Sequence, residues 1–288
     1  MGALRSLPTK LQRLNRMLIK IVRVAVITAF ATFKQPYKDM KKFIIGIDFS
    51  KETVDASIVQ KEQPETLIAY KKFRKNVVME CVLITSNNGS SQAGGVAGFS
   101  RGTIENCSVS GGVSGTVYVG GVVGAQWGGS ITGCSSSATV KGTVDVGGVA
   151  GQTNSNATMT ACYATGNVTI EINPAKNIAG GSLVGMNAGS SLLACYATGN
   201  VTSTGSSTGQ VHIGGFLGNN YTTVTAGYWK NNHEQGIGYN RESTGATKVD
   251  GSVVTWQKAV DAMNRALQNA GSEWRYELKG ALPTLRKQ

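Results

Sequence analysis

Apolar and polar positions in the middle of the chain follow one pattern that recurs five times between residues 92 and 229. Each copy has two glycines, two or three small or apolar residues and a further glycine, and a polar turn follows. Beyond each turn, Val, Ala and Cys alternate with polar residues, which predicts short strands with one apolar face. The last glycines of the five copies are Gly98, Gly124, Gly151, Gly185 and Gly218.

These last glycines lie 26, 27, 34 and 33 residues apart. A motif that recurs at spacings of this length indicates a supersecondary unit that stacks along one axis. A cysteine follows the last glycine of four copies, at Cys107, Cys134, Cys162 and Cys195. We therefore predict a mainly β protein, a right-handed parallel β-helix or solenoid of about five repeats. A small C-terminal α/β cap and a short, incomplete N-terminal β segment complete the predicted fold.

The glycines, asparagines and cysteines of the repeat have predicted structural roles. Glycine permits tight corners and a left-handed backbone, and Asn167 and Asn200 would stack at equivalent turns, where Asn tolerates positive φ. Equivalent cysteines would stack about 4.8 Å apart with parallel side chains, which is poor geometry for a disulfide. With Cys81 the cysteine count is odd, and no C-x-x-C pair occurs. We expect a ladder of buried free thiols.

Composition divides the chain into four predicted segments. They are a basic arm at 1–40, disordered or signal-like; an N-terminal fragment at 41–76; the repeat solenoid at 77–230; and a C-terminal cap with one helix at 231–288. In the last segment Trp256, Val260, Met263 and Leu267 share one helix face. We expect this segment to cover the unpaired strand edges at the solenoid end, in preference to forming an independent binding module.

The N-terminal arm holds most of the net charge. Residues 1–42 carry ten Lys or Arg against the single acid Asp39, a net +9 of the chain's +12. An apolar stretch at 22–33 follows this basic region, so a secretory signal and a basic amphipathic helix are both open. Nucleic-acid contact is expected only through this arm. No transmembrane span is expected, because no run of 18 apolar residues occurs.

Residues 43–50 and 53–59 are predicted strands joined by a tight turn. The phrase Ile45-Gly46-Ile47-Asp48 resembles the first strand of ribonuclease-H-like insertion-sequence transposases of the DEDD type. That resemblance implies that Asp48 helps to hold catalytic Mg²⁺. Two-metal chemistry needs several converging carboxylates, and the partners expected after residue 76 are absent. We interpret the segment as a remnant, joined to the repeats by a hybrid reading frame, with Asp48 catalytic only if the transposase interpretation holds.

The repeats carry a second resemblance. Residues 162–169 and 195–202 both read Cys-Tyr-Ala-Thr-Gly-Asn-Val-Thr, and this phrase, together with the glycine motif, resembles the GLUG motif family. The resemblance implies a bacterial protein, often at the cell surface or secreted, with a parallel β-helical fold. It implies no single shared activity.

Candidate catalytic residues do not form a set. Glycosidic acid–base chemistry needs two carboxylates about 5 to 9.5 Å apart, but Glu105, Asp145 and Glu171 fall at different phases of the repeat. His212 and His233 have no partner at ligand or triad spacing. The aspartates of the calcium-binding nonapeptide repeat are missing. We expect no enzyme activity, no metal site and no cofactor.

A weakly charged, Ser/Thr/Asn-lined face remains for binding. Aromatic side chains anchor interfaces, and the candidates are Trp127, Tyr221, Tyr228 and Trp229, whereas Tyr163 and Tyr196 are expected to form a packed aromatic ladder. The favoured function is a non-enzymatic structural or adhesin-like protein of the bacterial surface, with a glycan or a surface protein as partner. The alternatives are a truncated transposase and a polysaccharide-active β-helix enzyme. The expected location is the cell surface or the medium, and the cytoplasm if a native signal peptide was lost.

Overall fold

The computed structural model describes the backbone of strands 43–49, 53–60, 63–74 and 78–85, together with residues 92–173, 176–242 and 245–288. The basic arm at 1–40, the apolar stretch at 22–33 and the side chains of Asp48 and Cys81 lie outside the described residues. Strands β1 (Phe43–Phe49), β2 (Thr53–Gln60) and β3 (Gln63–Arg74) form an antiparallel sheet in the order β1-β2-β3. The two predicted N-terminal strands are thus confirmed.

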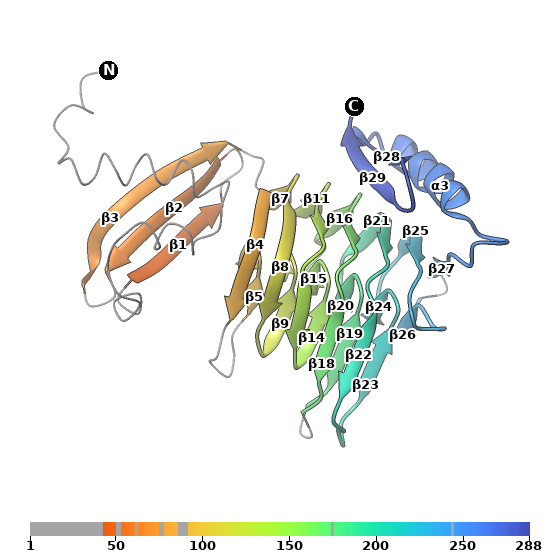
Figure 1. Cartoon of the computed structure of the whole chain (residues 1–288), viewed down its shortest axis with the longest axis horizontal. Coiled ribbons are helices and arrows are strands. Elements are labelled where there is room, and N and C mark those ends of the chain that lie inside the picture. Colours follow the sequence, from red (N-terminus) through yellow and green to blue (C-terminus); the bar gives the residue numbers. More distant parts are fainter. Residues whose placement is uncertain are drawn as a thin grey trace.

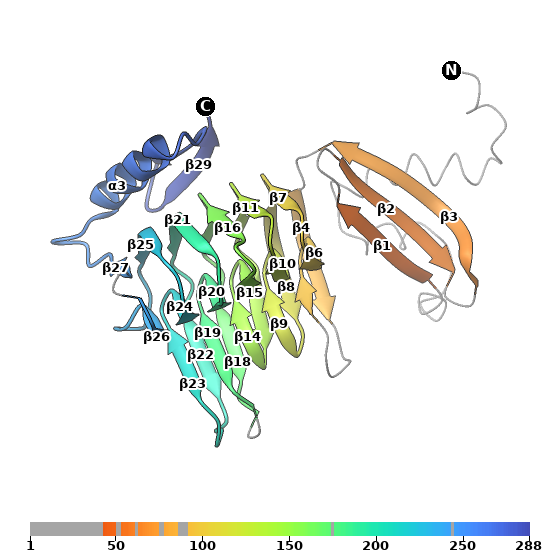
Figure 2. The same cartoon turned by 180° about the vertical axis from the view of Figure 1, so that it is seen from behind.

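Three parallel sheets run along the axis of the solenoid (Figures 1 and 2). The five-stranded sheet contains β5 (Ala93–Gly94), β9 (Val117–Gly120), β14 (Val144–Gly147), β19 (Ile178–Gly181) and β23 (Val211–Gly214). The six-stranded sheet contains β6 (Ala97–Ser100), β10 (Val123–Trp127), β15 (Ala150–Asn154), β20 (Val184–Asn187), β24 (Leu217–Asn220) and β26 (Ile237–Asn240).

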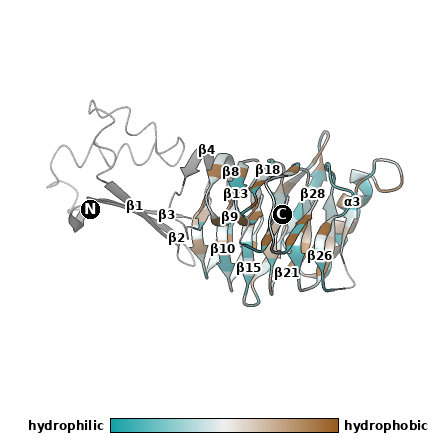
Figure 3. Cartoon of the chain, turned by 90° about the horizontal axis from the view of Figure 1, so that it is seen from below, coloured by the Kyte–Doolittle hydropathy of each residue, from teal (hydrophilic) through white to brown (hydrophobic). Residues whose placement is uncertain are grey.

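The third sheet is the largest. It contains β4 (Val78–Thr85), β7 (Thr103–Glu105), β8 (Ser108–Ser114), β11 (Ser130–Thr132), β12 (Ser135–Ser136), β13 (Thr139–Gly142), β16 (Thr158–Thr160), β17 (Tyr163–Ala164), β18 (Val168–Glu171), β21 (Ser191–Ala197), β22 (Val201–Thr204), β25 (Val224–Trp229) and β27 (Ala246–Lys248). Parallel pairing between successive coils throughout these sheets confirms the predicted β-solenoid. Hydrophilic and hydrophobic residues are interspersed along it on the face in view in Figure 3.

The register between coils reproduces the sequence period. Val117 pairs with Val144 and Val123 with Ala150, each 27 residues further on. The next coils are longer because extra residues separate β18 from β19 and β22 from β23. Residues 205–210 form a loop that projects from one edge of the solenoid (Figure 1).

The repeat glycines are required for close approach of backbones. A Cβ at Gly120 would lie 2.1 Å from the Val123 carbonyl oxygen, and one at Gly124 would lie 2.5 Å from the Gly98 carbonyl oxygen. None of the five repeat motifs has a glycine with positive φ, so the predicted left-handed role is wrong for them. The left-handed residue instead precedes the cysteine position of every coil. These residues are Asn106, Gly133, Ala161, Ala194 and Ala226, with φ between 51° and 61°.

The thiol and asparagine ladders are both present. All four repeat cysteines are buried, and the Sγ of Cys134 donates to the Thr132 carbonyl oxygen at 3.4 Å. The Oδ1 of Asn167 accepts from the backbone N–H of Asn200 at 3.0 Å. Neither asparagine has positive φ. The asparagines therefore stack as predicted, but they bond to the next coil's backbone with an ordinary conformation of their own.

The C-terminal segment contains helix α3 (Trp256–Asn269) and the antiparallel strands β28 (Trp274–Leu278) and β29 (Pro283–Lys287). The helix is confirmed, and its predicted apolar face is buried. That face packs along the side of the 13-stranded sheet, against β21 and β25 (Figures 1 and 2). Within the segment expected to cover the solenoid end, β26 (Ile237–Asn240) and β27 (Ala246–Lys248) pair with the last full coil, whereas helix α3 lies on the side of the sheet. No helix among the described residues is long and apolar enough to cross a membrane.

Candidate ligand-binding surface

One row of the six-stranded sheet ends in exposed aromatic residues at both extremes. Parallel pairing places six residues at equivalent positions in neighbouring strands. This binding row consists of Phe99, Ala125, Gln152, Met186, Asn219 and Tyr239. Phe99 is 40% and Tyr239 41% exposed, and within the described residues only Val253 is a further exposed large apolar side chain. Six strands at the usual spacing give the row a length of about 24 Å.

Trp127 covers the second position of the row. Its ring meets that of Phe99 edge to face, with centroids 5.5 Å apart, a favourable aromatic arrangement. Its Nε1–H donates to Gln152 Oε1 at 3.0 Å, so the indole contacts the neighbours of Ala125 on both sides. The Arg101 guanidinium lies 5.4 Å from the Phe99 centroid and adds a cation–π contact. This end of the row is thus a preformed aromatic platform.

Polar groups follow in the middle of the row. Gln152 Nε2 donates to Asp145 Oδ2 at 3.4 Å and lies 3.5 Å from Met186 Sδ. Burial raises the pKa of Asp145 to about 7, while the hydrogen bond from Gln152 opposes the shift. Asn219 Oδ1 is buried and has no hydrogen-bond partner among the described residues. An unsatisfied buried acceptor is costly, so a donor supplied at this point would be favourable.

Aromatic rings gather again at the far end. The His212 ring stacks on Tyr239 with centroids 5.1 Å apart and an interplanar angle of 23°. Tyr221 lies 5.7 Å from Tyr239, tilted by 49°. His212 comes from β23 of the five-stranded sheet, so two sheets contribute to this cluster. The row therefore has flat aromatic faces at its two ends and amide groups between them.

The four aromatic residues expected from the sequence to bind ligand fall in three places. Trp127 and Tyr221, both half-buried, belong to the two ends of the binding row. Tyr228 is half-buried on the 13-stranded sheet, away from the row. Trp229 is only 6% exposed and lies in the core, and its Nε1–H donates to the His233 carbonyl oxygen. We therefore correct the assignment of Trp229, whose ring fills the last coils.

Sequence reasoning missed Phe99 and Tyr239. Each directly follows the last glycine of its motif, after Gly98 and Gly238. Aligning the copies on that glycine would have placed both residues in one row. The motif around Gly236 and Gly238 is shortened, so the glycine pattern alone assigns Tyr239 no register.

Tyr163 and Tyr196 form the expected ladder. Their rings stack with centroids 4.9 Å apart and only 3° between planes. Burial raises the pKa of Tyr196, and its hydroxyl donates to the Pro283 carbonyl oxygen at 2.5 Å. The pair thus serves the docking of the C-terminal segment.

The three acids considered for catalysis occupy different surroundings. Glu105 forms an ion pair with Lys287 at 3.1 Å, and Glu171 pairs with Lys141 at 2.8 Å. Asp145 bonds to Gln152 in the middle of the row. His233 Nε2 lies 3.0 Å from the Val201 carbonyl oxygen. Within the described part of the chain, no three His, Cys, Asp or Glu side chains are placed to hold a metal ion.

Comparison with known families assigns one coil. Residues 115–141 match the family model of the GLUG motif. This coil is a GLUG repeat. It spans β9 to β13, and the neighbouring coils pair with it in register, so they repeat the GLUG coil in structure. No curated protein and no solved structure matches the chain. Nothing in these comparisons supports the transposase resemblance of residues 41–76.

Proposed function

We propose that this GLUG-repeat solenoid is a non-enzymatic, adhesin-like protein of the bacterial surface that binds an extended neutral glycan along the binding row. The observation that carries the proposal is the position of Phe99 and Tyr239. These two exposed aromatic side chains occupy the same register row at opposite ends of one rigid sheet.

The chemistry of the row suits a sugar chain. Aromatic rings offer flat apolar faces on which sugar rings can stack, while amide groups exchange hydrogen bonds with hydroxyls. The half-buried Asn219 supplies an amide between the aromatic ends, whereas the Gln152 amide is engaged by Trp127 and Asp145. The interstrand hydrogen bonds fix the spacing of these groups, so little conformational entropy is lost on binding. A linear polymer about as long as the row would engage both ends together.

The arrangement of acids supports a role without catalysis. Glu105 and Glu171 are engaged by lysines, and Asp145 is buried beneath Gln152. A glycosidase needs two carboxylates flanking the scissile bond, and these three lie on strands of different coils or sheets. The proposed location at the surface follows the type of protein in which GLUG repeats are typically found.

A binding assay with the full-length protein tests the proposal. The probes are neutral hexasaccharides of glucose, N-acetylglucosamine and mannose, measured by calorimetry. Phe99→Ala, Trp127→Ala and Tyr239→Ala should each weaken the best interaction at least tenfold, because each removes a stacking face. Val253→Ser is the matched control, since it removes an exposed apolar side chain outside the row.

Two results would contradict this function. One is the absence of binding to every probe, which would leave a purely architectural role. The other is release of reducing ends that stops in Glu105→Gln or Asp145→Asn, which would make the protein a polysaccharide-active enzyme.

A further inference from the structure

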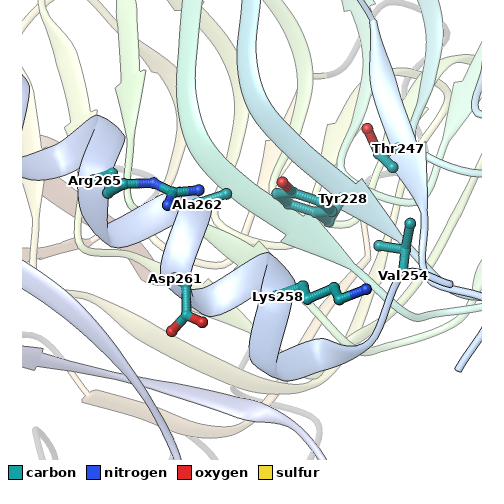
Figure 4. A pocket seen from close by; sticks show the side chains of 7 residues that line it. All are labelled: Tyr228, Thr247, Val254, Lys258, Asp261, Ala262 and Arg265. Atoms are coloured by element: carbon teal, nitrogen blue, oxygen red, sulfur yellow. The ribbon is translucent and has the colours of Figure 1, made fainter. Parts of the chain in front are cut away.

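A separate cleft lies between helix α3 and strands β25 and β27. Its volume is about 390 Å³, within the range of small-molecule sites. The residues that line it are Tyr228, Thr247, Val254, Lys258, Asp261, Ala262 and Arg265 (Figure 4). The cleft is on the 13-stranded sheet and shares no residue with the binding row.

Positive charge dominates this cleft. Lys258 and Arg265 are seven residues apart on α3, which places them on one helix face. Asp261 lies between them, but its Oδ1 accepts from Gln257 Nε2 at 2.8 Å, and its carboxylate points away from Tyr228 in Figure 4. None of the ion pairs found among the described residues includes Arg265. The guanidinium is therefore available to an anion.

Tyr228 forms the back of the cleft. The residue is half-buried and pairs with Tyr196 in the register of the sheet. Burial raises the pKa of its phenol, while the positive charge of Arg265, which lines the same cleft, opposes that shift. The phenol stays protonated at neutral pH and can donate. Thr247 adds a second hydroxyl at the rim.

We propose that this cleft binds a uronic acid, a six-membered sugar ring that carries a carboxylate. The Arg265 guanidinium receives the carboxylate, because its parallel N–H groups match two carboxylate oxygens, and Lys258 adds charge. The sugar ring packs against Tyr228, and its hydroxyls meet the hydroxyls of Tyr228 and Thr247. This site takes an acidic sugar, whereas the binding row takes a neutral chain, and the two proposals stand independently.

Calorimetric titration of the full-length protein with glucuronate tests the site, with glucose as the neutral analogue and acetate as the carboxylate without a ring. Glucuronate should bind at least tenfold more tightly than either. Arg265→Gln should weaken glucuronate binding at least tenfold. Raising the salt concentration from 50 to 500 mM should also weaken it, because exposed charges are screened.

Lys176→Gln is the matched control, since it removes one exposed positive charge far along the chain from the cleft, and it should leave binding unchanged. Trp127→Ala should also leave glucuronate binding unchanged, which separates this site from the binding row. Equal affinity for acetate and glucuronate would overturn the assignment to a sugar acid. Equal affinity of Arg265→Gln and the native protein, with both folded by circular dichroism, would overturn the site.

Discussion

Asp145 combines a left-handed backbone with nearly complete burial. Its φ is 48°, a region in which Asn and Asp are tolerated better than other side chains with a Cβ. The side chain is 6% exposed and its hydrogen-bond partner is the neutral amide of Gln152. Because the effect of burial outweighs that of the hydrogen bond from Gln152, the neutral carboxyl is favoured in the folded protein.

This residue should make stability fall as pH rises. The pKa of Asp145 is about 7 when folded, against 3.8 for an ordinary aspartate. Between those values the unfolded chain loses the proton and the folded protein keeps it, so the free energy of unfolding decreases with pH. The loss levels off above about pH 7 and amounts to a few kcal/mol, since one pKa unit is worth about 1.4 kcal/mol.

Asp145→Asn should remove this dependence. The Asn carbonyl can still accept from Gln152, and Asn suits the left-handed conformation. We expect the variant to match the native protein near pH 4 and to melt several degrees higher at pH 8, because about 1 kcal/mol shifts Tm by roughly 2–4 °C at this size. Thermal unfolding followed by circular dichroism from pH 4 to 8 measures both. Parallel pH profiles for the two proteins would contradict the assignment.

At this scale, the sequence predicted positions better than conformations. The repeated glycine motif placed the coils correctly. It could not predict the backbone conformation, because glycine suits both positive φ and close backbone approach. The structure uses it for the second purpose at Gly120 and Gly124. Ala161 and Ala194 adopt positive φ, and nothing about alanine signals this. Stacking against the adjacent coils imposes that conformation against local preference.

Helix α3 and the β28–β29 hairpin act together as a lateral clamp. Their apolar residues share a second core with Ala194, Tyr196 and other outward-facing residues of the 13-stranded sheet. The Tyr276 hydroxyl lies 2.9 Å from the Ala194 carbonyl oxygen and 3.3 Å from that of Cys162. One buried phenol thus links two successive coils.

Tyr276→Phe should weaken the clamp without unfolding it. The change keeps the ring but removes the donor to the Ala194 carbonyl oxygen, at a cost of about 1–3 kcal/mol, while the Cys162 carbonyl oxygen still accepts from the Tyr196 backbone N–H. In urea unfolding we expect a lower midpoint and an unchanged slope, since the buried surface is the same. Thr284→Val, which removes an exposed hydroxyl from the same hairpin, is the control and should unfold like the native protein. A midpoint equal to the native value for Tyr276→Phe would show that the phenol adds nothing.

The helix could be predicted from the sequence, but its docking site could not. The spacing of Trp256, Val260, Met263 and Leu267 defines an apolar face, and such a face fits the end or the side of a solenoid equally well. The decisive signal is the run Leu192–Ala197, in which apolar residues occupy successive positions of one strand. Such a run indicates a strand buried on both faces, and here the second face lies beneath the clamp.

Across the whole molecule, the coils are stabilised by contacts with their neighbours and by contacts with the clamp. A solenoid coil contacts mainly its neighbours, whereas the hairpin reaches from Cys162 and Ala194 to the Lys287–Glu105 ion pair in the first coil. That distant contact is exposed on the lysine side, and exposed ion pairs contribute little. Coils beneath the second core should therefore open less often than the first coil.

The binding row is also a property of the whole molecule. Its members come from six coils and no single repeat contains two of them, so composition alone could not reveal it. Phe99 and Tyr239 are 140 residues apart in the sequence. Only the number of coils and the register between them bring the two rings into one line, and the extra residues of the longer coils lie between strands, outside that register.

The rate at which each cysteine of the thiol ladder is modified would measure how often its coil opens. One cysteine lies in each of four successive coils, sealed from solvent, and burial raises the pKa of Cys162 well above its ordinary value. Each thiol can react with N-ethylmaleimide only when its own coil opens. Mass spectrometry of peptides from the native protein should show Cys107 modified first and Cys162 and Cys195 last, whereas identical rates would mean that all coils open together. The four cysteines would therefore report the opening rates of four successive coils.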